Sequence, residues 1–229
     1  MLTVTTTRPT FGRSTEKHAV VKEGGTRMPR NGVKADTRTV VLESAKKVLR
    51  QKGYAKLSTR DVAAAAGVPL SQIHYHFGSK QGMMLALFEY LNSQLLDRQN
   101  ALFRDSALKL SEQWDRACDY LDEDIASGYV RVLQELMAAS WGDGAVAKVV
   151  QAGIMGWMKL ITDLARRAER EFGGLGPFTA EEVAALVAHA FIGAESHYLL
   201  GLEKKGVPVR PALRRFGDLI RIVESAHRK

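Results

Sequence analysis

The sequence predicts an all-α protein, with a small helical head near the N-terminal end and a larger helical bundle after it. From Thr37 onward, apolar residues recur three and four positions apart, which is the spacing of one face of a helix. No segment alternates apolar and polar residues as a half-buried strand does. Glycine and proline interrupt the helical pattern and divide the chain into its predicted helices.

The head begins with a predicted helix over residues 37–52. A second helix begins at Ser58, because Ser58 and Asp61 form an S-x-x-D capping box, and it ends at Gly67, where the chain needs a positive φ. A third short helix covers residues 70–77. Two short helices joined by a glycine turn are the plan of a helix-turn-helix, whose second helix lies in the major groove of DNA.

The rest of the chain is predicted to form the bundle. One of its helices begins at a second capping box, formed by Thr179 and Glu182. The expected helices of the bundle cover residues 79–103, 107–126, 128–141, 144–172, 179–202 and 210–227. The chain therefore divides into an N-terminal segment of residues 1–35, a head of residues 36–82 and a bundle of residues 83–229.

The positive charge of the chain is concentrated at its N-terminal end. Residues 1–35 hold 7 Lys and Arg against 2 Asp and Glu and show no sustained periodicity, which is typical of a disordered basic arm. Such an arm can follow a minor groove, or it can be an extension without a specific role. Residues 1–80 hold 15 Lys and Arg against 5 Asp and Glu, whereas residues 81–229 hold 18 against 20. A basic head on a nearly neutral body indicates a protein that docks one end on a polyanion.

Several classes of protein are disfavoured by the sequence. The single cysteine, Cys118, excludes an intramolecular disulfide and fits a reducing compartment. The first 20 residues lack the apolar segment of a signal peptide, and the weakly charged run over residues 183–202 is better explained by a buried helix than by a membrane span. His74 and His76 lie two apart on a helix and cannot share a metal ion. We expect a cytoplasmic protein without a cofactor or a metal site.

The head carries a set of residues at fixed spacings. They are Ala45, Gly53, Leu57, Ser58, Thr59, Arg60, Val62, Ala63, Ala66, Gly67, Val68, Ile73, Tyr75, His76, Phe77, Ser79 and Lys80. This pattern, over residues 37–90, resembles that of the tetracycline-repressor (TetR) family of transcriptional regulators. The resemblance implies a homodimer that represses transcription from a palindromic DNA operator and releases the operator when a small, apolar effector binds in the bundle.

The resemblance also implies which residues contact double-stranded DNA. Leu70, Ser71 and Gln72 would face the groove, where Gln72 can form two hydrogen bonds to adenine. Arg60 matches a position that reaches bases or phosphates, and other residues match positions that hold the phosphate backbone. The candidate DNA-binding residues are Ser58, Thr59, Arg60, Leu70, Ser71, Gln72, His74, Tyr75, His76 and Lys80.

The head departs from the family pattern at two positions. The family commonly has Ser or Thr where Pro69 stands, and Pro69 has no hydroxyl with which to cap a helix or contact phosphate. The family also commonly has an aromatic residue where His74 stands. Because histidine gains charge as the pH falls, DNA binding is expected to depend on pH if His74 lies at the interface.

In the resembled family the bundle holds a small-molecule pocket. Large or soft side chains of the central helices, with a few polar groups such as Tyr129, would suit an apolar organic ligand. Ordinary core packing is the alternative interpretation for each of them. The candidate pocket residues are Trp114, Cys118, Met137, Trp141, Met155, Trp157, His189 and Glu195.

The resemblance implies that the last two helices form the dimer interface. The helix over residues 179–202 carries small residues that allow close approach, and the last helix has an apolar stripe with arginines beside it. Packing within one chain is the alternative. The candidate interface residues are Ala190, Gly193, Ala194, His197, Gly201, Leu213, Phe216 and Ile220.

The expected switch runs through the helix that begins at Ser79. Ligand binding would move this helix and change the separation of the two recognition helices of the dimer. Gly82 lies in its first turn, and we predict that Gly82→Ala stiffens the connection and reduces ligand-induced release. Two other functions stay open. One is a DNA-binding protein of this fold without a small-molecule switch; the other is an all-α enzyme, although no paired carboxylates or nucleophile–base pair stand out.

Overall fold

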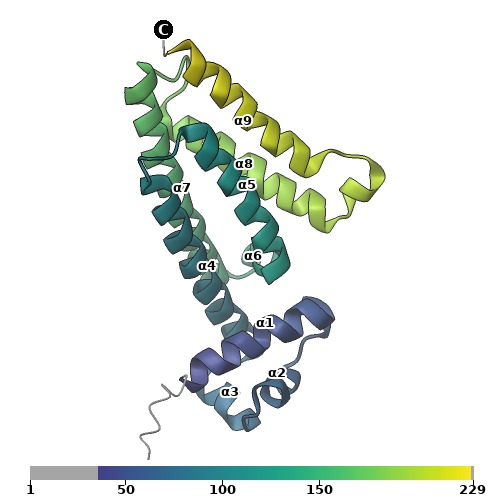
Figure 1. Ribbon diagram of the computed structural model, residues 1–229. Coiled ribbons are helices and arrows are strands. Elements are labelled where there is room, and N and C mark those ends of the chain that lie inside the picture. The colour runs from purple at the N-terminus through teal and green to yellow at the C-terminus, as the bar shows by residue number, and fades with distance from the viewer. Residues whose placement is uncertain (1–35, 228–229) are drawn as a thin grey trace, which may run out of the picture. The chain divides into compact units, whose positions relative to one another are not determined.

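The computed structural model describes residues 36–227. Within this range the chain forms nine α-helices and one short 3-10 helix, and none of these residues lies in a strand, so the predicted all-α fold is confirmed (Figure 1). The predicted basic arm, residues 1–35, lies outside the described residues. The head consists of α1 (Thr37–Lys56), α2 (Thr59–Ala66) and α3 (Leu70–Phe77).

The turns of the head follow the predicted local chemistry. The Ser58 hydroxyl accepts a hydrogen bond from the Asp61 N–H at 3.2 Å, and the Asp61 carboxylate accepts one from the Ser58 N–H at 3.2 Å, which is the predicted capping box. Gly67 ends α2 with a φ of 65°. Gly53 has a φ of 74° and interrupts α1, so the regular part of that helix ends where the sequence predicts.

The bundle contains the remaining helices. They are α4 (Lys80–Arg104), α5 (Leu110–Ser127), α6 (Tyr129–Ser140), α7 (Gly144–Phe172), α8 (Ala180–Leu199), the 3-10 helix η1 (Leu202–Lys205) and α9 (Val209–Ala226). The predicted capping box of Thr179 and Glu182 is present at the start of α8. The structure also places a helix end at Gly173, as predicted.

α5 begins three residues later than the sequence predicts, because the chain first makes a turn. The Asp105 carboxylate accepts a hydrogen bond from the Ala107 N–H at 2.9 Å. The Gln113 side-chain amide donates to the carbonyl of Asp105 at 2.7 Å and to that of Leu102 at 3.1 Å. These bonds satisfy backbone groups between α4 and α5 that a longer helix would have used.

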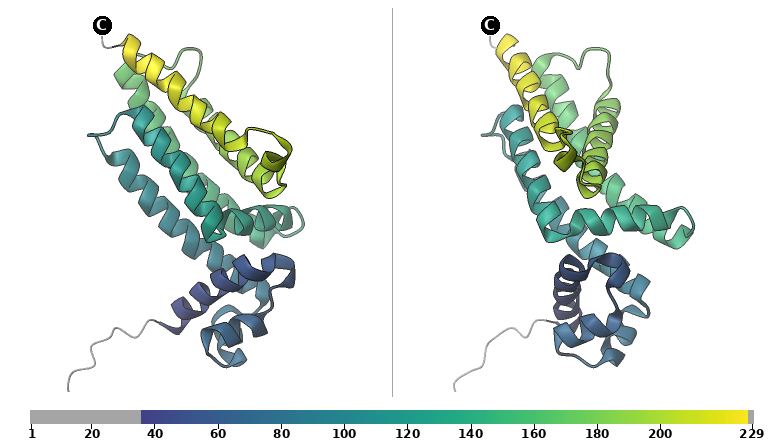
Figure 2. Two further views of the ribbon diagram at one scale, coloured as in Figure 1. Left: turned by 45° about the vertical axis from the view of Figure 1, so that its right-hand side comes forward. Right: turned by 90° about the vertical axis from the view of Figure 1, so that its right-hand side faces the viewer.

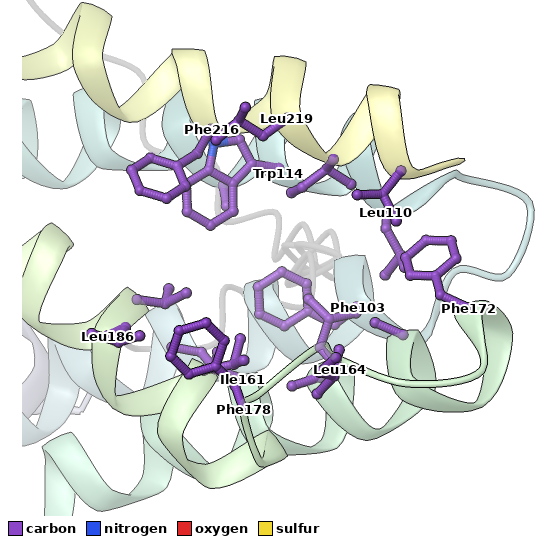
Figure 3. Close-up of a pocket in the computed structure, with 18 of the residues that line it drawn as sticks. Phe103, Leu110, Trp114, Ile161, Leu164, Phe172, Phe178, Leu186, Phe216 and Leu219 are labelled. Atoms are coloured by element: carbon purple, nitrogen blue, oxygen red, sulfur yellow. The ribbon is translucent and has the colours of Figure 1, made fainter. Parts of the chain in front are cut away.

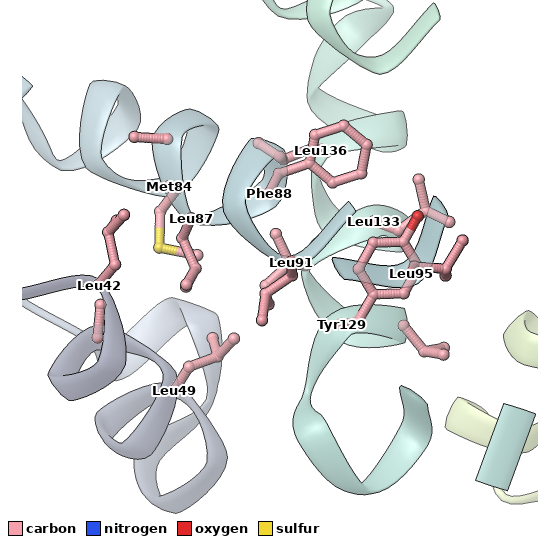
Figure 4. Packing of buried hydrophobic residues seen from close by; sticks show 14 of the residues in the cluster. Leu42, Leu49, Met84, Leu87, Phe88, Leu91, Leu95, Tyr129, Leu133 and Leu136 are labelled. Carbon is pink, nitrogen blue, oxygen red and sulfur yellow. The ribbon is translucent and has the colours of Figure 1, made fainter. Parts of the chain in front are cut away.

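α4 connects the head to the bundle, because it is buried in both. Near its start, Met84 and Leu87 belong to a buried cluster that also contains Leu42 of α1 (Figure 4). One turn further on, the ring of Phe88 stacks on that of Tyr129 of α6, with 5.9 Å between the ring centroids. α4 therefore packs against α1 near its start and against α6 in the bundle.

Two helix pairs frame the far part of the bundle, as α8 packs along α7 and α9 packs along α5 (Figure 2). The indole N–H of Trp114, on α5, donates to the carbonyl of Leu213, on α9, at 2.8 Å. α7 approaches α4 closely at Gly153, where an added Cβ would lie 2.7 Å from the ring of Phe88. None of the helices within residues 36–227 combines the length and the hydropathy that a membrane span requires.

Candidate DNA-binding surface and ligand cavity

α3 is held by one face and leaves the other face free. Ile73 and Phe77 are buried in the core of the head. On the opposite side, Ser71 and His74 are exposed, and Tyr75 is 81% exposed. A polar and aromatic surface of this kind on the second helix of a helix-turn-helix can meet the edges of bases and the phosphates beside them.

Most of the other predicted contact residues lie on accessible parts of α2 and α3. Arg60 is exposed near the start of α2, and Thr59 is half-buried beside it. On α3, Leu70, Gln72 and His76 are half-buried.

Three predicted contact residues have partners within the chain. The Ser58 hydroxyl is engaged in the capping box, and it also donates to the Asp61 carboxylate at 2.8 Å. The Lys80 ammonium donates to the carbonyl of Tyr54 at 2.9 Å and lies 4.8 Å from the centre of the Tyr54 ring, so it joins the start of α4 to the end of α1. His74 places Nδ1 3.1 Å from the Gly78 carbonyl, and an N–H donated there leaves Nε2 facing outward.

The bundle contains a cavity of about 840 Å³ that is partly open to the surface. Figure 3 shows apolar side chains on both sides of the cavity, with Trp114 and Phe216 facing Ile161 and Phe178. The walls come from α4, α5, α7, α8 and α9 and from the loop over residues 173–178. A cavity of this size and composition fits an apolar organic molecule.

A row of aromatic rings leads from the surface into the bundle. Phe216, which is 50% exposed, lies 5.7 Å from Trp114, measured between ring centroids. Trp114 lies 5.6 Å from Phe191, and Phe191 lies 5.8 Å from Trp157, both in edge-to-face geometry. The Trp157 indole N–H donates to the Gln99 side-chain oxygen at 2.7 Å, so this polar group is satisfied within the wall.

Behind the aromatic row lies a second, small chamber of about 30 Å³. It shares Gln99, Ala117, Trp157 and Phe191 with the wall of the large cavity. Its lining also includes acidic and phenolic groups, which are Asp124, Tyr129 and Glu195. The small polar chamber therefore adjoins the large apolar cavity, and the two share part of their walls.

Burial controls the protonation of these groups. Burial raises the pKa of Glu195 to about 8, against the smaller opposing effect of a hydrogen bond from the Gln134 amide at 3.3 Å. Burial also raises the pKa of Asp124 to about 6, which the Arg98 guanidinium limits by donating to both Asp124 oxygens at 2.8 and 2.9 Å. Tyr129 is buried as well, which raises its pKa, and its hydroxyl donates to Asn92 at 2.9 Å.

The predicted pocket residues are only partly brought together. Trp114 and Trp157 line the large cavity, and Glu195 lines the small chamber. The others belong to neither lining: Trp141 lies in the turn after α6, and the rest lie on other faces of their helices. Trp141 and Met155 are 86% and 62% exposed, His189 is exposed, Met137 packs against the core, and Cys118 is buried in the core, where burial raises its thiol pKa to about 11.

The prediction missed most of the apolar wall. The largest contribution comes from one face of α7 and from the loop that follows it, and their residues include Ile161, Leu164, Ala165, Ala168, Phe172, Leu175 and Phe178. On α7 they repeat at helical spacing, which was a usable signal. That spacing also fits a helix packed in a core, so the sequence did not show that a cavity covers it.

Residues 41–87 match a family described as bacterial regulatory proteins, tetR family. The HTH-type transcriptional regulator CymR from Pseudomonas putida is 32% identical to this chain over 122 residues, which are 51% of this chain and 57% of CymR. The head and the start of α4, residues 41–87, therefore carry the DNA-binding region of the TetR family. The alignment thus covers little more than half of the length of CymR.

Solved structures agree with this TetR fold over the bundle as well. A TetR transcriptional regulator from Legionella pneumophila has a TM-score of 0.66 and 17% identity, with 82% of this chain and 98% of that chain covered. A structure from Saccharomonospora viridis in complex with choline has a TM-score of 0.64 and 22% identity, with 79% of this chain and 93% of that chain covered. At sequence identities this low, the similarity to these structures shows a shared fold and nothing about function.

The TetR-type dimer residues predicted on α8 and α9 fall into three groups. Ala194 and Leu213 are 8% and 5% exposed within a single chain, so the assignment of both to an interface is corrected: they are core residues. Those that line the cavity are Ala190, Phe216 and Ile220. Those that are at least partly accessible outside it are Gly193, His197 and Gly201. Exposed apolar residues of α8 and α9 that the sequence did not single out are Leu186, Leu219, Ile222 and Val223.

The expectation for Gly82→Ala is also corrected. A Cβ at Gly82 would lie 2.1 Å from the carbonyl oxygen of Phe77, in the turn between α3 and α4. Because this contact is with backbone, the turn itself would have to shift. Alanine would distort the start of α4 and the end of the recognition helix, and would not simply stiffen α4.

Proposed function

We propose that this protein is a homodimeric repressor of the TetR family that binds a palindromic DNA operator through α3 and releases it when an apolar molecule occupies the cavity. One observation carries the proposal: a single helix, α4, begins at the turn after α3 and reaches the cavity wall at Gln99 and Phe103. A ligand that displaces the far end of α4 would tilt its near end. The distance between the two recognition helices of the dimer would then change.

The surface of α9 supports the dimer. Phe216, Leu219, Ile222 and Val223 form an exposed apolar stripe on α9, and all but Ile222 also line the cavity. Leu219 and Ile222 are 57% and 65% exposed. Exposed apolar stripes of this kind mark protein–protein contacts. A twofold dimer through α8 and α9 would place two α3 helices on half-sites about one turn of DNA apart.

The two other functions receive less support. A regulator without a small-molecule switch would be favoured by a bundle that is closed and has no polar anchor. Here the large cavity is open to the surface, and the chamber beside it contains Glu195. For an enzyme, no group of three or more His, Cys, Asp or Glu within residues 36–227 could hold a metal ion. The family and the similar chain CymR are regulatory. The solved S. viridis structure holds choline, so a small molecule is found with a protein of this fold.

The DNA half of the proposal is tested by fluorescence anisotropy at near-physiological salt, with the duplex upstream of the protein's own gene and a scrambled duplex. We expect the upstream duplex to bind at least about 1,000-fold more tightly. Tyr75→Ala should weaken binding to both duplexes, as a lost phosphate contact does, whereas Gln72→Ala should weaken binding to the upstream duplex alone. Equal binding of both duplexes by the wild-type protein would contradict an operator at this location.

The ligand half is tested by filling the cavity. Ala168 lines the cavity on α7, whereas Ala139 is exposed on α6 and serves as the matched control. We expect n-decanol to raise the unfolding temperature of the wild-type protein and of Ala139→Phe, and not that of Ala168→Phe. Both variants should bind DNA as the wild type does. An equal n-decanol response in Ala168→Phe would show that the cavity is not the binding site.

A further inference from the structure

The small chamber beside the large cavity contains one acid without a cationic partner among the described residues. Asp124 is neutralised by Arg98, whose guanidinium donates to both of its oxygens. Glu195 is 7% exposed and receives a single long hydrogen bond, at 3.3 Å from the Gln134 amide to Oε2. Its other oxygen, Oε1, accepts no hydrogen bond within residues 36–227.

The groups around Glu195 would favour a cation and repel an anion. α5 contributes Asp124, and α6 contributes the neutral Tyr129 and Gln134. α4 contributes Arg98, whose charge is already matched by Asp124 and by a second ion pair to Glu123. α7 contributes uncharged groups to this chamber. An incoming carboxylate would meet acidic groups without an available positive charge, whereas an ammonium group would meet a carboxyl group that is ready to accept its hydrogen bonds.

The surrounding aromatic rings and the size of the chamber limit which charged head group can bind there. Trp157 and Phe191 line both the large cavity and the small chamber. The faces of these aromatic rings can therefore lie against a positively charged head group. A chamber of about 30 Å³ has room for a group the size of one or two water molecules. A primary ammonium group meets this limit, and a trimethylammonium group exceeds it.

We propose that the effector is a primary amine with a long apolar body, whose ammonium group donates hydrogen bonds to Glu195 and whose body fills the large cavity along the row from Trp157 to Phe216. This proposal rests on the proposed function of the cavity as a ligand site, and it adds the chemical class of the ligand. The apolar body supplies the buried area, and the charged head supplies the selection against alcohols and fatty acids.

Binding of such an amine would release a proton. The pKa of Glu195 is about 8, so most of the empty sites hold the neutral acid at pH 7. A bound ammonium group favours the carboxylate and expels that proton. Most of a proton should leave for each amine bound at pH 7, and much less at pH 9. A primary alkylamine keeps its own charge through this range, because its pKa is near 10.

Isothermal titration calorimetry of the full-length protein with n-decylamine and n-decanol tests the proposal. We expect n-decylamine to bind at least tenfold more tightly than n-decanol, and n-decyltrimethylammonium to bind at least tenfold more weakly than n-decylamine. Glu195→Gln should lose at least tenfold in n-decylamine affinity and keep its n-decanol affinity, which also verifies its fold. Glu169→Gln, at an exposed glutamate of α7, is the matched control and should behave as the wild type. Titrations in buffers of different ionisation enthalpy count the released protons.

The outcomes separate this proposal from the function on which it rests. Two results would overturn the proposal that the effector is an amine, while the proposal of an apolar ligand site would be kept. One is that n-decanol binds as tightly as n-decylamine; the other is that Glu195→Gln binds n-decylamine as the wild type does. The same holds if no proton is released at pH 7. If none of the three probes binds to the wild-type protein, both proposals are overturned: that the cavity is a ligand site, and that the ligand is an amine.

Discussion

The carboxylate of Glu224, on α9, accepts two hydrogen bonds from Ser111, in the first turn of α5. The Ser111 backbone N–H donates at 3.0 Å and its hydroxyl at 2.7 Å, and both residues are buried. A carboxylate at this place also interacts favourably with the positive end of the α5 dipole. This contact holds together the two helices that form one wall of the cavity, next to Leu110, which lines it.

We predict that Glu224→Ala destabilises the protein by about 1–3 kcal/mol, because two buried donors of Ser111 lose their acceptor. Glu224→Gln keeps one acceptor oxygen and should fall between the alanine variant and the wild type. Urea denaturation followed by circular dichroism measures the free energy of unfolding. Glu169→Ala, at an exposed glutamate, is the control and should change it by less than about 0.5 kcal/mol. Equal stability of Glu224→Ala and the wild type would show that water replaces the carboxylate.

Glu195 is predicted to make stability depend on pH. Its pKa is about 8 in the folded protein and near its ordinary value of 4.5 in the unfolded chain, so the folded state binds the proton more tightly. The contribution of Glu195 is complete below about pH 4.5 and is lost as the pH rises towards 8. Within this window the free energy of unfolding should fall by up to about 1.4 kcal/mol for each pH unit relative to Glu195→Gln.

The comparison is made by urea denaturation of the two proteins from pH 5 to pH 9. The histidines are present in both proteins, so their titration cancels in the difference, whereas Asp124 interacts with Glu195 and adds to the difference. A difference that does not change with pH would mean that Glu195 is ionised throughout the range. The carboxyl group would then have water or a cation beside it in solution.

The sequence predicted structure best where neighbouring residues determine it. The capping boxes at Ser58 and Thr179 and the positive φ of Gly67 depend on groups within four positions of one another. The contact between Ser111 and Glu224 joins residues that are 113 positions apart, and no local sequence pattern predicts it. Helical spacing reveals that a residue lies on an apolar face, but not which element covers that face.

The same limit explains the errors in the candidate pocket. Trp141 and Met155 were grouped with Trp157 by size and type, yet the three side chains point to different surroundings. Glu195 does lie beside the large cavity, in the lining of the small chamber. A carboxyl group within an apolar helix is unusual, and unusual residues mark candidate sites more reliably than large ones.

The exposed stripe of α9 is predicted to hold the dimer together. Ile222→Asp introduces a charge at a side chain that is 65% exposed, so the fold of one chain should remain while an apolar interface is lost. Met155→Asp, at a 62% exposed methionine of α7, is the matched control. Sedimentation velocity should find a monomer for Ile222→Asp and a dimer for Met155→Asp and the wild type. A dimeric Ile222→Asp would place the interface elsewhere.

Gly82 is predicted to be required for the geometry of the turn between the recognition helix and α4. Its N–H donates to the Ser79 hydroxyl at 3.0 Å, and the Phe77 carbonyl leaves no room for a Cβ. Gly82→Ala should therefore destabilise the protein by about 1–3 kcal/mol and weaken operator binding in the absence of any ligand. Anisotropy with operator DNA measures the affinity, and urea denaturation measures the stability.

The matched control for this variant is Gly144→Ala, at the first residue of α7, where an added Cβ meets nothing within 4 Å. It should bind the operator as the wild type does. If Gly82→Ala keeps full operator affinity and loses only the response to ligand, the turn absorbs the extra methyl group. The glycine would then act by making α4 flexible, because alanine in a helix is favoured over glycine by up to about 1 kcal/mol.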